Sequence, residues 1–290
     1  MRWTRGGKSE NLEDRRAESG GRGMRMGGGL GLGGLVVVAV ISLLMGQNPL
    51  DLLTQLLGAT GGEQIAVGAP PSAESLAKEE ESVQFVSFVL DDAQATWARL
   101  LPGAGASYQD AKLVLFRDAI ESACGYAESA MGPFYCPGDR KVYVDLGFYD
   151  ELKQRFGASG DFAQAYVIAH ELGHHVQNLL GIEGKVRRAQ GANPDRENDL
   201  SVRMELQADC LAGIWGHSTA QRNILEGGDV EEGLNAAAAI GDDRIQRMST
   251  GRVHPESFTH GSSAQRVAWF KRGLESGDVS SCDTFSARAP

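Results

Sequence analysis

The side chains best suited to chemistry lie in one short segment, His170-Glu171-Leu172-Gly173-His174. Its neighbours favour a helix, on which residues four positions apart project to the same side. Both imidazoles can therefore reach one zinc ion, at about 2.1 Å each. Glu171 points away from the first histidine, so it can hold the water that the metal activates and act as a general base. The pattern predicts metal-assisted hydrolysis.

A catalytic zinc ion usually has three protein ligands, and a carboxylate further along the chain can supply the third. Glu205 and Asp209 are four residues apart in the helix-forming segment MELQADCLAGIWG. The stretch between His174 and Glu205 is long enough for a turn, a loop and a second helix against the first. We expect Glu205 to be the third ligand and Asp209 to accept a hydrogen bond from His170 or His174.

Two other ligand arrangements are less consistent with the sequence. A metzincin site needs a glycine and a histidine where this chain has Gln177 and Leu180. His175 directly follows the second histidine, but it points about 100° away around the helix. We therefore expect His175 to pack or to support the site, and we expect His170, His174 and Glu205 to form a gluzincin set.

A hydrogen-bond donor for the oxyanion of a tetrahedral intermediate is harder to choose. His260 precedes a helix start in the segment Phe-Thr-His-Gly-Ser-Ser and could act as that catalytic donor. It could equally cap or pack the loop. Tyr143 and Tyr166 are alternative donors on position alone, and His217 and His254 are expected at the surface.

The chain resembles the bacterial neutral zinc metallopeptidase family over almost its whole length. The segments that carry the resemblance are Met1-Arg2-Trp3, Asn11 to Arg16, His170 to Gly181, Glu205 to Trp215 and Phe258 to Phe270. The resemblance implies a zinc-dependent peptidase with a zincin-like fold on a membrane-anchored bacterial protein. It implies no particular substrate.

The N-terminal part differs from the rest in charge and hydropathy. Residues 1–26 carry seven basic and four acidic side chains, whereas the whole chain has a net charge of -10. No charged residue occurs from Met26 to Leu50, and about 20 apolar helical residues can cross a bilayer. The sequence predicts a transmembrane signal-anchor at 27–48, with residues 1–26 in the cytoplasm and the catalytic domain outside it. This topology corresponds to a single-pass protein of the bacterial inner membrane, and a cleaved signal peptide is the alternative.

The remainder divides into a tether and one domain. Residues 49–74 are predicted to be a flexible linker, because the part from 58 to 74 is rich in Gly, Ala and Pro. Residues 75–290 are predicted to form the zinc metallopeptidase domain. A hydrophobic content of 42% supports a globular core, and the acidic balance disfavours nucleic acid as a partner. The expected partners are a protein or peptide substrate and, through the anchor, the membrane. The sequence leaves the oligomeric state open.

Periodicity and turn signals predict an α+β fold that is mostly helical with a small sheet, preceded by one transmembrane helix. The expected helices cover 75–101, 148–156, 161–181, 195–217, 229–249 and 262–275, and the expected strands cover 112–116 and 141–146. The second strand lies just upstream of the active helix. We expect it to be the edge that pairs with an extended substrate.

Four cysteines lie beyond the apolar segment, and none forms a C-x-x-C pair. Cys124 and Cys136 flank a short loop, so a disulfide between them is favoured. Cys210 lies in a predicted helix and could be bridged to Cys282 or remain a buried thiol.

These observations favour a zinc-dependent peptidase that uses Glu171 as general base and Zn²⁺ as cofactor. The alternative from another class is a non-catalytic, zinc-stabilised binding or chaperone module of the cell envelope. A hydrolase of non-peptide amides would use the same water chemistry.

Overall fold

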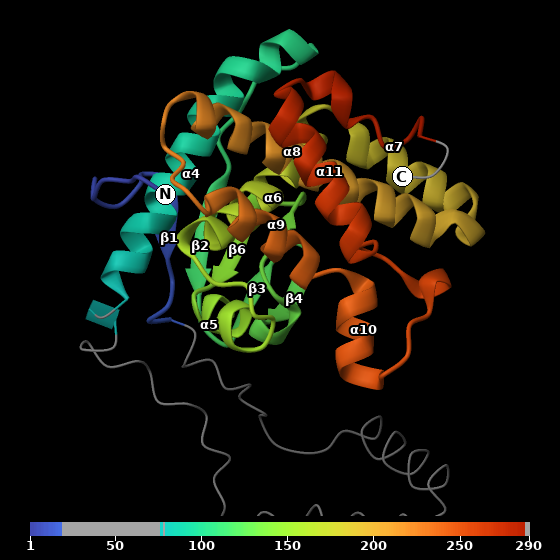
Figure 1. Cartoon of the computed structure of the whole chain (residues 1–290), viewed down its shortest axis with the longest axis horizontal. Coiled ribbons are helices and arrows are strands. Elements are labelled where there is room, and N and C mark those ends of the chain that lie inside the picture. Colours follow the sequence, from blue (N-terminus) through green and yellow to red (C-terminus); the bar gives the residue numbers. More distant parts are fainter. Residues whose placement is uncertain (19–75, 78, 288–290) are drawn as a thin grey trace, which may run out of the picture.

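The computed structural model describes residues 1–18, 76–77 and 79–287 of the chain (Figure 1). Its α-helices are α4 (Glu80–Leu100), α5 (Gly147–Gln154), α6 (Asp161–Leu179), α7 (Ile182–Ala192), α8 (Glu197–Gln221), α9 (Asp229–Ala239), α10 (Asp242–Thr250) and α11 (Ser263–Ser276). Its strands are β1 (Leu12–Asp14), β2 (Lys112–Phe116), β3 (Ala119–Ser122), β4 (Gly125–Glu128), β5 (Phe134–Cys136) and β6 (Lys141–Asp145). The described part is therefore a mixed helical and sheet structure.

Four of the strands form one sheet in the order β1-β2-β6-β5. β1, β2 and β6 run parallel, whereas β5 is antiparallel to β6 and forms one edge. Strands β3 and β4 form a separate hairpin. The expectation that residues 141–146 are the edge strand is wrong, because β6 lies between β2 and β5.

The interior strand β2 is apolar because it is buried on both faces. Leu113 and Leu115 pack in the core that contains α4 and α6. Val114 and Phe116 point the other way and pack with residues of the β3–β4 hairpin. This alternation follows the two-residue period of a strand, and it fixes the sheet between a helical core and the hairpin.

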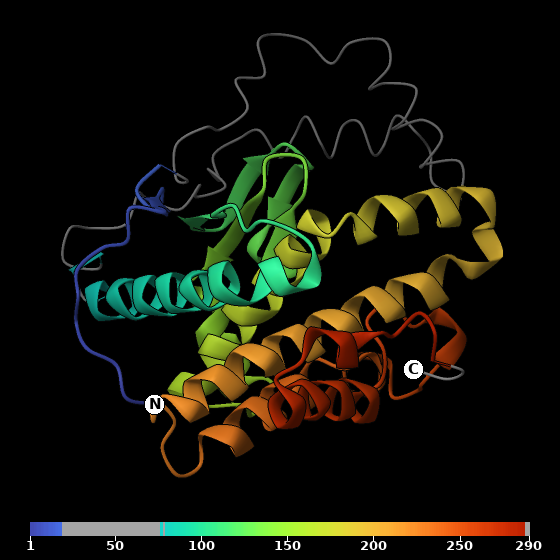
Figure 2. The same cartoon turned by 90° about the horizontal axis from the view of Figure 1, so that it is seen from above.

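Helix α6 is the element around which the rest is arranged. It contacts α4, α8 and α9 as well as β5 and β6 (Figures 1 and 2). Most of its residues are apolar or small and buried, which explains why no clean polar face runs along it. Two further helices, α8 and α11, pack closely on one another beside it.

The N-terminal residues belong to this same folded unit. The α-ammonium group of Met1 donates hydrogen bonds to Asp161 at 2.7 Å and to Asp229 at 3.2 Å, and β1 pairs with β2. Residues 1–18 and the body of the protein therefore lie together. The predicted topology, with the basic segment in the cytoplasm and the domain outside it, is wrong.

The structure also corrects the predicted transmembrane helix and the single-pass inner-membrane localisation that rested on it. None of the described helices is both long and apolar enough to cross a bilayer. The segment predicted as the anchor, 27–48, and the linker, 49–74, lie outside the described residues.

Two helical predictions differ from the structure. The helix expected over 229–249 is divided into α9 and α10 at Gly241, where a side-chain carbon would lie 2.4 Å from the backbone nitrogen of Ser263. A second difference is α7, which the sequence did not predict. The start of α11 agrees with expectation, since Ser262 and Gln265 form a capping box.

Two disulfides are present. Cys124–Cys136 is the predicted bridge, and it joins the β3–β4 turn to the edge strand β5. Cys210–Cys282, which the sequence left open, ties α8 to the segment after α11.

Candidate metal centre

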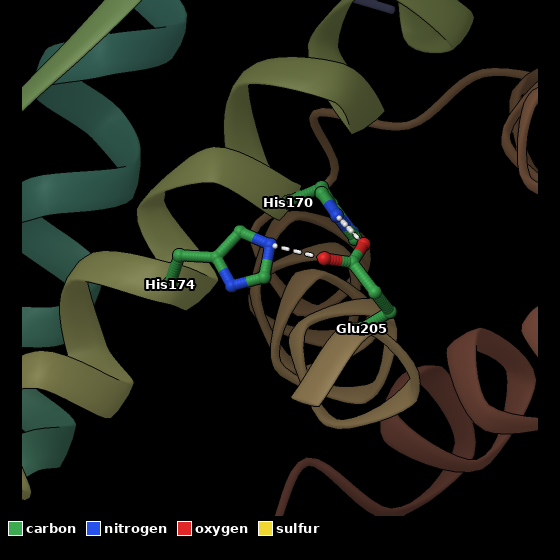
Figure 3. Close-up of side chains that lie close together, drawn as sticks. All are labelled: His170, His174 and Glu205. Atoms are coloured by element: carbon green, nitrogen blue, oxygen red, sulfur yellow. Dashed lines mark hydrogen bonds and ion pairs between the residues drawn. The ribbon is translucent and has the colours of Figure 1, made fainter. Parts of the chain in front are cut away.

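Three predicted ligands meet between α6 and α8. Nε2 of His170 lies 3.1 Å from one carboxylate oxygen of Glu205, and Nε2 of His174 lies 3.3 Å from the other (Figure 3). One ligand atom from each of the three residues lies within 4.8 Å of the others. The spacing predicted from the sequence thus brings two imidazoles and one carboxylate to a single point.

A glycine lets the two helices approach closely enough for this meeting. Gly173 faces Ala208 of α8, and a side-chain carbon at 173 would lie 2.9 Å from the Ala208 carbonyl oxygen. Any larger residue would therefore push α8, and Glu205 with it, away from the histidines.

Asp209 supports the first histidine. Its Oδ1 lies 2.9 Å from Nδ1 of His170, and the hydroxyl of Tyr166 also donates to Asp209. Since Nδ1 carries the proton in this bond, Nε2 is left to face Glu205. The sequence predicted that Asp209 would accept from one of the two histidines, and the structure identifies that histidine as His170.

Arg266 is a central residue that the sequence reasoning missed. Its guanidinium is buried and binds both oxygens of Asp209, at 2.8 and 2.9 Å. Nη2, the nitrogen that donates to Oδ1 of Asp209, also lies 3.3 Å from Nδ1 of His170. Arg266 comes from α11 and lies within the segment Phe258 to Phe270, which carries part of the family resemblance, but no local pattern assigns Arg266 a role.

Gln177 supports the second histidine. Its Oε1 lies 2.9 Å from Nδ1 of His174, and its Nε2 donates to the Met204 carbonyl at 2.8 Å. This arrangement directs Nε2 of His174 toward Glu205. The sequence reasoning used Gln177 only to exclude a metzincin site, since a local pattern does not show which side chains meet across helices.

The electrostatics of the site favour positive charge. Burial alone would lower the pKa of His170, but the charge of Asp209 and hydrogen bonds with Asp209 and Glu205 raise it to about 10. Burial alone would also lower the pKa of His174, but the charge of Glu205 and its hydrogen bond together raise it. Two imidazole nitrogens and one carboxylate are a donor set typical of catalytic zinc, so the residues fit this metal.

Glu171 lies beside these three residues without belonging to their cluster. It is 7% exposed and lines the same cavity as the candidate ligands. Burial raises the pKa of its carboxyl group, whereas the charges of His170 and His174 lower it, and burial has the larger effect. A carboxylate with a raised pKa is better able to take up a proton near neutral pH.

The cavity has a volume of about 610 Å³ and extends from the candidate ligands to β5. His260 also lines it, and its Nδ1 lies 3.3 Å from Asp242. Tyr143 and Tyr166 do not line the cavity wall that the described residues form: the first donates to Asp139 and the second to Asp209. Of the donors considered from the sequence, His260 is the one that lines this cavity.

The remaining histidines lie away from the ligand cluster. His175 is fully buried, and its Nε2 lies 2.6 Å from the Gln109 carbonyl oxygen. His217 contacts the Leu274 carbonyl, and His254 is exposed beside Glu256. The expectation that His175 packs instead of joining the ligand cluster agrees with its position.

Comparisons with known proteins agree with this site. Residues 1–285 match the family described as "Putative neutral zinc metallopeptidase". The uncharacterized protein YpfJ of Escherichia coli strain K12 is 51% identical over 293 residues, which cover 98% of this chain and 99% of that protein. The uncharacterized protein Mb2605 of Mycobacterium bovis is 48% identical over 205 residues, 67% of each chain. No solved structure matches the chain.

Proposed function

Because the chain belongs to this family of neutral zinc metallopeptidases, we propose that it hydrolyses peptide bonds with Glu171 as the general base. The observation that carries the proposal is the meeting of His170, His174 and Glu205 beside a buried glutamate in one cavity. A site that only stabilised the fold would have no need for a second carboxylate at an open position.

His170 and His174 would hold zinc through Nε2, and Glu205 would hold it through its carboxylate. Zinc, when bound, lowers the pKa of a coordinated water to about 7 and polarises a carbonyl group. Asp209 and Gln177 keep the two rings in the tautomer that leaves Nε2 available. These supporting contacts reduce the reorganisation needed when the metal arrives.

Glu171 would accept a proton from the attacking water and return it to the amine that leaves. Its raised pKa suits both steps, since a base of intermediate strength can also release the proton. His260, on the cavity wall, would donate a hydrogen bond to the oxygen that gains negative charge. The hydrogen bond with Asp242 and the charges of Glu205 and Asp242 outweigh burial, raise the pKa of the ring and favour this donor role.

The edge strand β5 offers a binding mode for the substrate. Among the described strands, β5 pairs only with β6, so its other side is available for an extended peptide. Phe134 and Tyr135 of this strand line the same cavity as Glu171. Backbone hydrogen bonds along β5 would present a peptide bond of the substrate to the site.

A peptide-cleavage assay of the zinc-loaded protein tests this function. Wild type, Glu171→Gln and Glu121→Gln are each incubated with a library of unstructured peptides, and the products are identified by mass spectrometry. Glu121→Gln is the matched control, since Glu121 is exposed on β3. We expect cleavage by wild type and the control, and at least about 100-fold less by Glu171→Gln with zinc content unchanged.

Two results would overturn the proposal. Equal cleavage by Glu171→Gln would exclude Glu171 as the base. A fully zinc-loaded wild type that cleaves none of the peptides would favour the non-catalytic binding module instead.

A further inference from the structure

The short edge strand β5 is held from both of its faces. Phe134 and Cys136 lie on the side of the sheet that faces the β3–β4 hairpin. On this side Phe134 stacks on Tyr143 of β6, with ring centroids 4.8 Å apart, and Cys136 is bridged to Cys124. Tyr135 points the opposite way, as the alternation of a strand requires. The first face is therefore fixed by a covalent bond, and the second depends on what Tyr135 contacts.

Tyr135 takes part in a hydrogen-bond chain whose direction can be assigned. Nε2 of His175 lies 2.6 Å from the Gln109 carbonyl oxygen, which can only accept, so Nε2 carries the proton. In the neutral ring, Nδ1 then accepts from the Tyr135 hydroxyl at 3.0 Å. That hydroxyl in turn accepts from Nδ2 of Asn178 at 2.9 Å. Each hydrogen bond in this chain has a fixed donor and a fixed acceptor, so the Tyr135 hydroxyl has one preferred position.

We propose that Tyr135 is a positioning residue, which sets the edge strand at a fixed distance from the metal ligands through its hydrogen bonds to α6. The expected change in KM rests on the proposed peptidase function, whereas the expected loosening of β5 does not.

The partners of Tyr135 lie on the ligand-bearing helix itself. His175 is the residue after His174, and Asn178 is one turn further along α6. The position of a peptide paired with β5 would therefore be fixed relative to α6, the helix that carries His170 and His174. A strand held in place relative to that helix can bind a peptide without first being ordered, so a looser strand binds the peptide more weakly.

A purely packing role for Tyr135 predicts a different behaviour. The Tyr135 ring lies 5.4 Å from the His175 ring, a contact that phenylalanine would preserve. The positioning role depends on the hydroxyl, which phenylalanine lacks. Tyr135→Phe therefore separates the two roles, and Tyr126→Phe is a matched control because Tyr126 is 67% exposed on β4.

The first measurement is hydrogen–deuterium exchange in the zinc-loaded protein, followed for a peptide that covers residues 133–137. We expect Tyr135→Phe to exchange about tenfold faster there than wild type, as the loss of a half-buried hydroxyl with two hydrogen bonds predicts, and Tyr126→Phe to leave it unchanged. Zinc affinity should not change, since the ligands and their partners remain. Unchanged exchange in Tyr135→Phe would overturn the proposal, whether or not the protein cleaves peptides.

The second measurement uses a peptide that the wild type cleaves. Tyr135→Phe should raise KM about tenfold and leave kcat within about twofold, because a looser strand weakens binding without touching Glu171 or the ligands. Asn178→Ala should act through the same hydroxyl, so the double variant should be no worse than the more damaging single variant. Strictly additive effects, or a fall in kcat alone, would contradict the positioning role.

The two arms keep separate failures apart. If the zinc-loaded wild type cleaves nothing, the peptidase function fails, and the exchange measurement still decides whether Tyr135 tethers β5. If cleavage occurs but Tyr135→Phe matches Tyr126→Phe in both exchange and KM, the proposal for Tyr135 fails alone.

Discussion

Two groups of side chains that could hold a metal ion lie along α6. One consists of Asp161, Asp229 and Glu232, and the other of His170, His174 and Glu205. They differ in the source of the positive charge that balances their carboxylates. At the start of the helix, ligand atoms of Asp161, Asp229 and Glu232 lie within 4.8 Å of one another. The Met1 ammonium donates to the first two, and Glu232 accepts from the backbone nitrogen of Phe162. The chain itself supplies the cation at this end.

At the second cluster, the nearby cationic side chain, Arg266, binds Asp209 and not Glu205. Arg266 binds both oxygens of Asp209, while Glu205 faces the imidazoles of His170 and His174. Without a metal, the carboxylates of this cluster hold protons on the two imidazoles, since they raise the pKa of both rings, and zinc would displace these protons on binding. The comparison indicates that an acidic cluster closed by the chain's own ammonium needs no ion, whereas the Glu205 cluster is arranged to receive one.

The sharpest way to break this comparison is to remove one charge from each cluster. Glu205→Gln should weaken zinc binding by more than the roughly 100-fold expected for a supporting residue, because a direct ligand is lost. Glu232→Gln makes the same chemical change at the other cluster and should leave zinc affinity unchanged. Calorimetric titration of both variants with zinc measures this, and equal losses would contradict the account.

Removing the charge of Arg266 tests whether this side chain balances the buried carboxylate of Asp209. Arg266→Met leaves the charge of Asp209 buried without its guanidinium partner, and should cost about 3–5 kcal/mol of unfolding free energy. Lys271→Met, on the same helix, disrupts an exposed pair with Glu275 and should cost less than about 1 kcal/mol. Urea unfolding of both variants gives the values, and a similar small loss in each would refute the buried role of Arg266.

Asp209→Asn should have a smaller effect on the metal. The amide can still contact His170 but no longer carries charge, so zinc affinity or activity should fall by about 10–100-fold. Competition with a zinc chelator of known affinity measures the change. A loss as large as that of Glu205→Gln would mean that Asp209 is itself a ligand.

The smallest effect concerns pH and the Met1 cluster. Burial lowers the pKa of the Met1 ammonium, but hydrogen bonds and attraction to Asp161 and Asp229 outweigh burial and raise it above its ordinary value of 8.0. A raised folded-state pKa stabilises the fold below about pH 8, and this contribution is lost as the pH rises through the folded pKa.

We therefore expect the unfolding free energy to fall on the order of 1 kcal/mol between pH 8 and the folded pKa. Thermal or urea unfolding across this range checks it. Asp229→Asn should flatten the dependence, and an unchanged slope in that variant would assign the titration to another group.

The candidate ligands could be predicted because they depend on local spacing. His170 and His174 are four residues apart on one helix, and Glu205 begins a second such pair. Arg266 could not be placed in this way, since it lies 57 residues beyond Asp209 and meets it only through the packing of α11 on α8. The supporting role of Gln177 could not be predicted for a related reason: its contact with Met204 joins two different helices.

The fold shows the same division between local and distant information. The long helices α4, α6, α8 and α11 were predicted from periodicity and caps, whereas β1 and β5 span only three residues each and carry too little pattern. Pro133 and Pro137 on either side of β5 also read as turn residues. The predicted membrane topology was wrong because local charge and hydropathy do not reveal that Met1 packs against Asp161 and Asp229.

The central claim is that zinc binds between α6 and α8 and not at the other acidic cluster. The most direct test is a crystal structure of the zinc-loaded protein, with diffraction data collected on both sides of the zinc absorption edge. We predict one anomalous peak, bonded to Nε2 of His170, Nε2 of His174 and the carboxylate of Glu205. A peak among Asp161, Asp229 and Glu232, or one bonded to the two histidines and a residue other than Glu205, would contradict it.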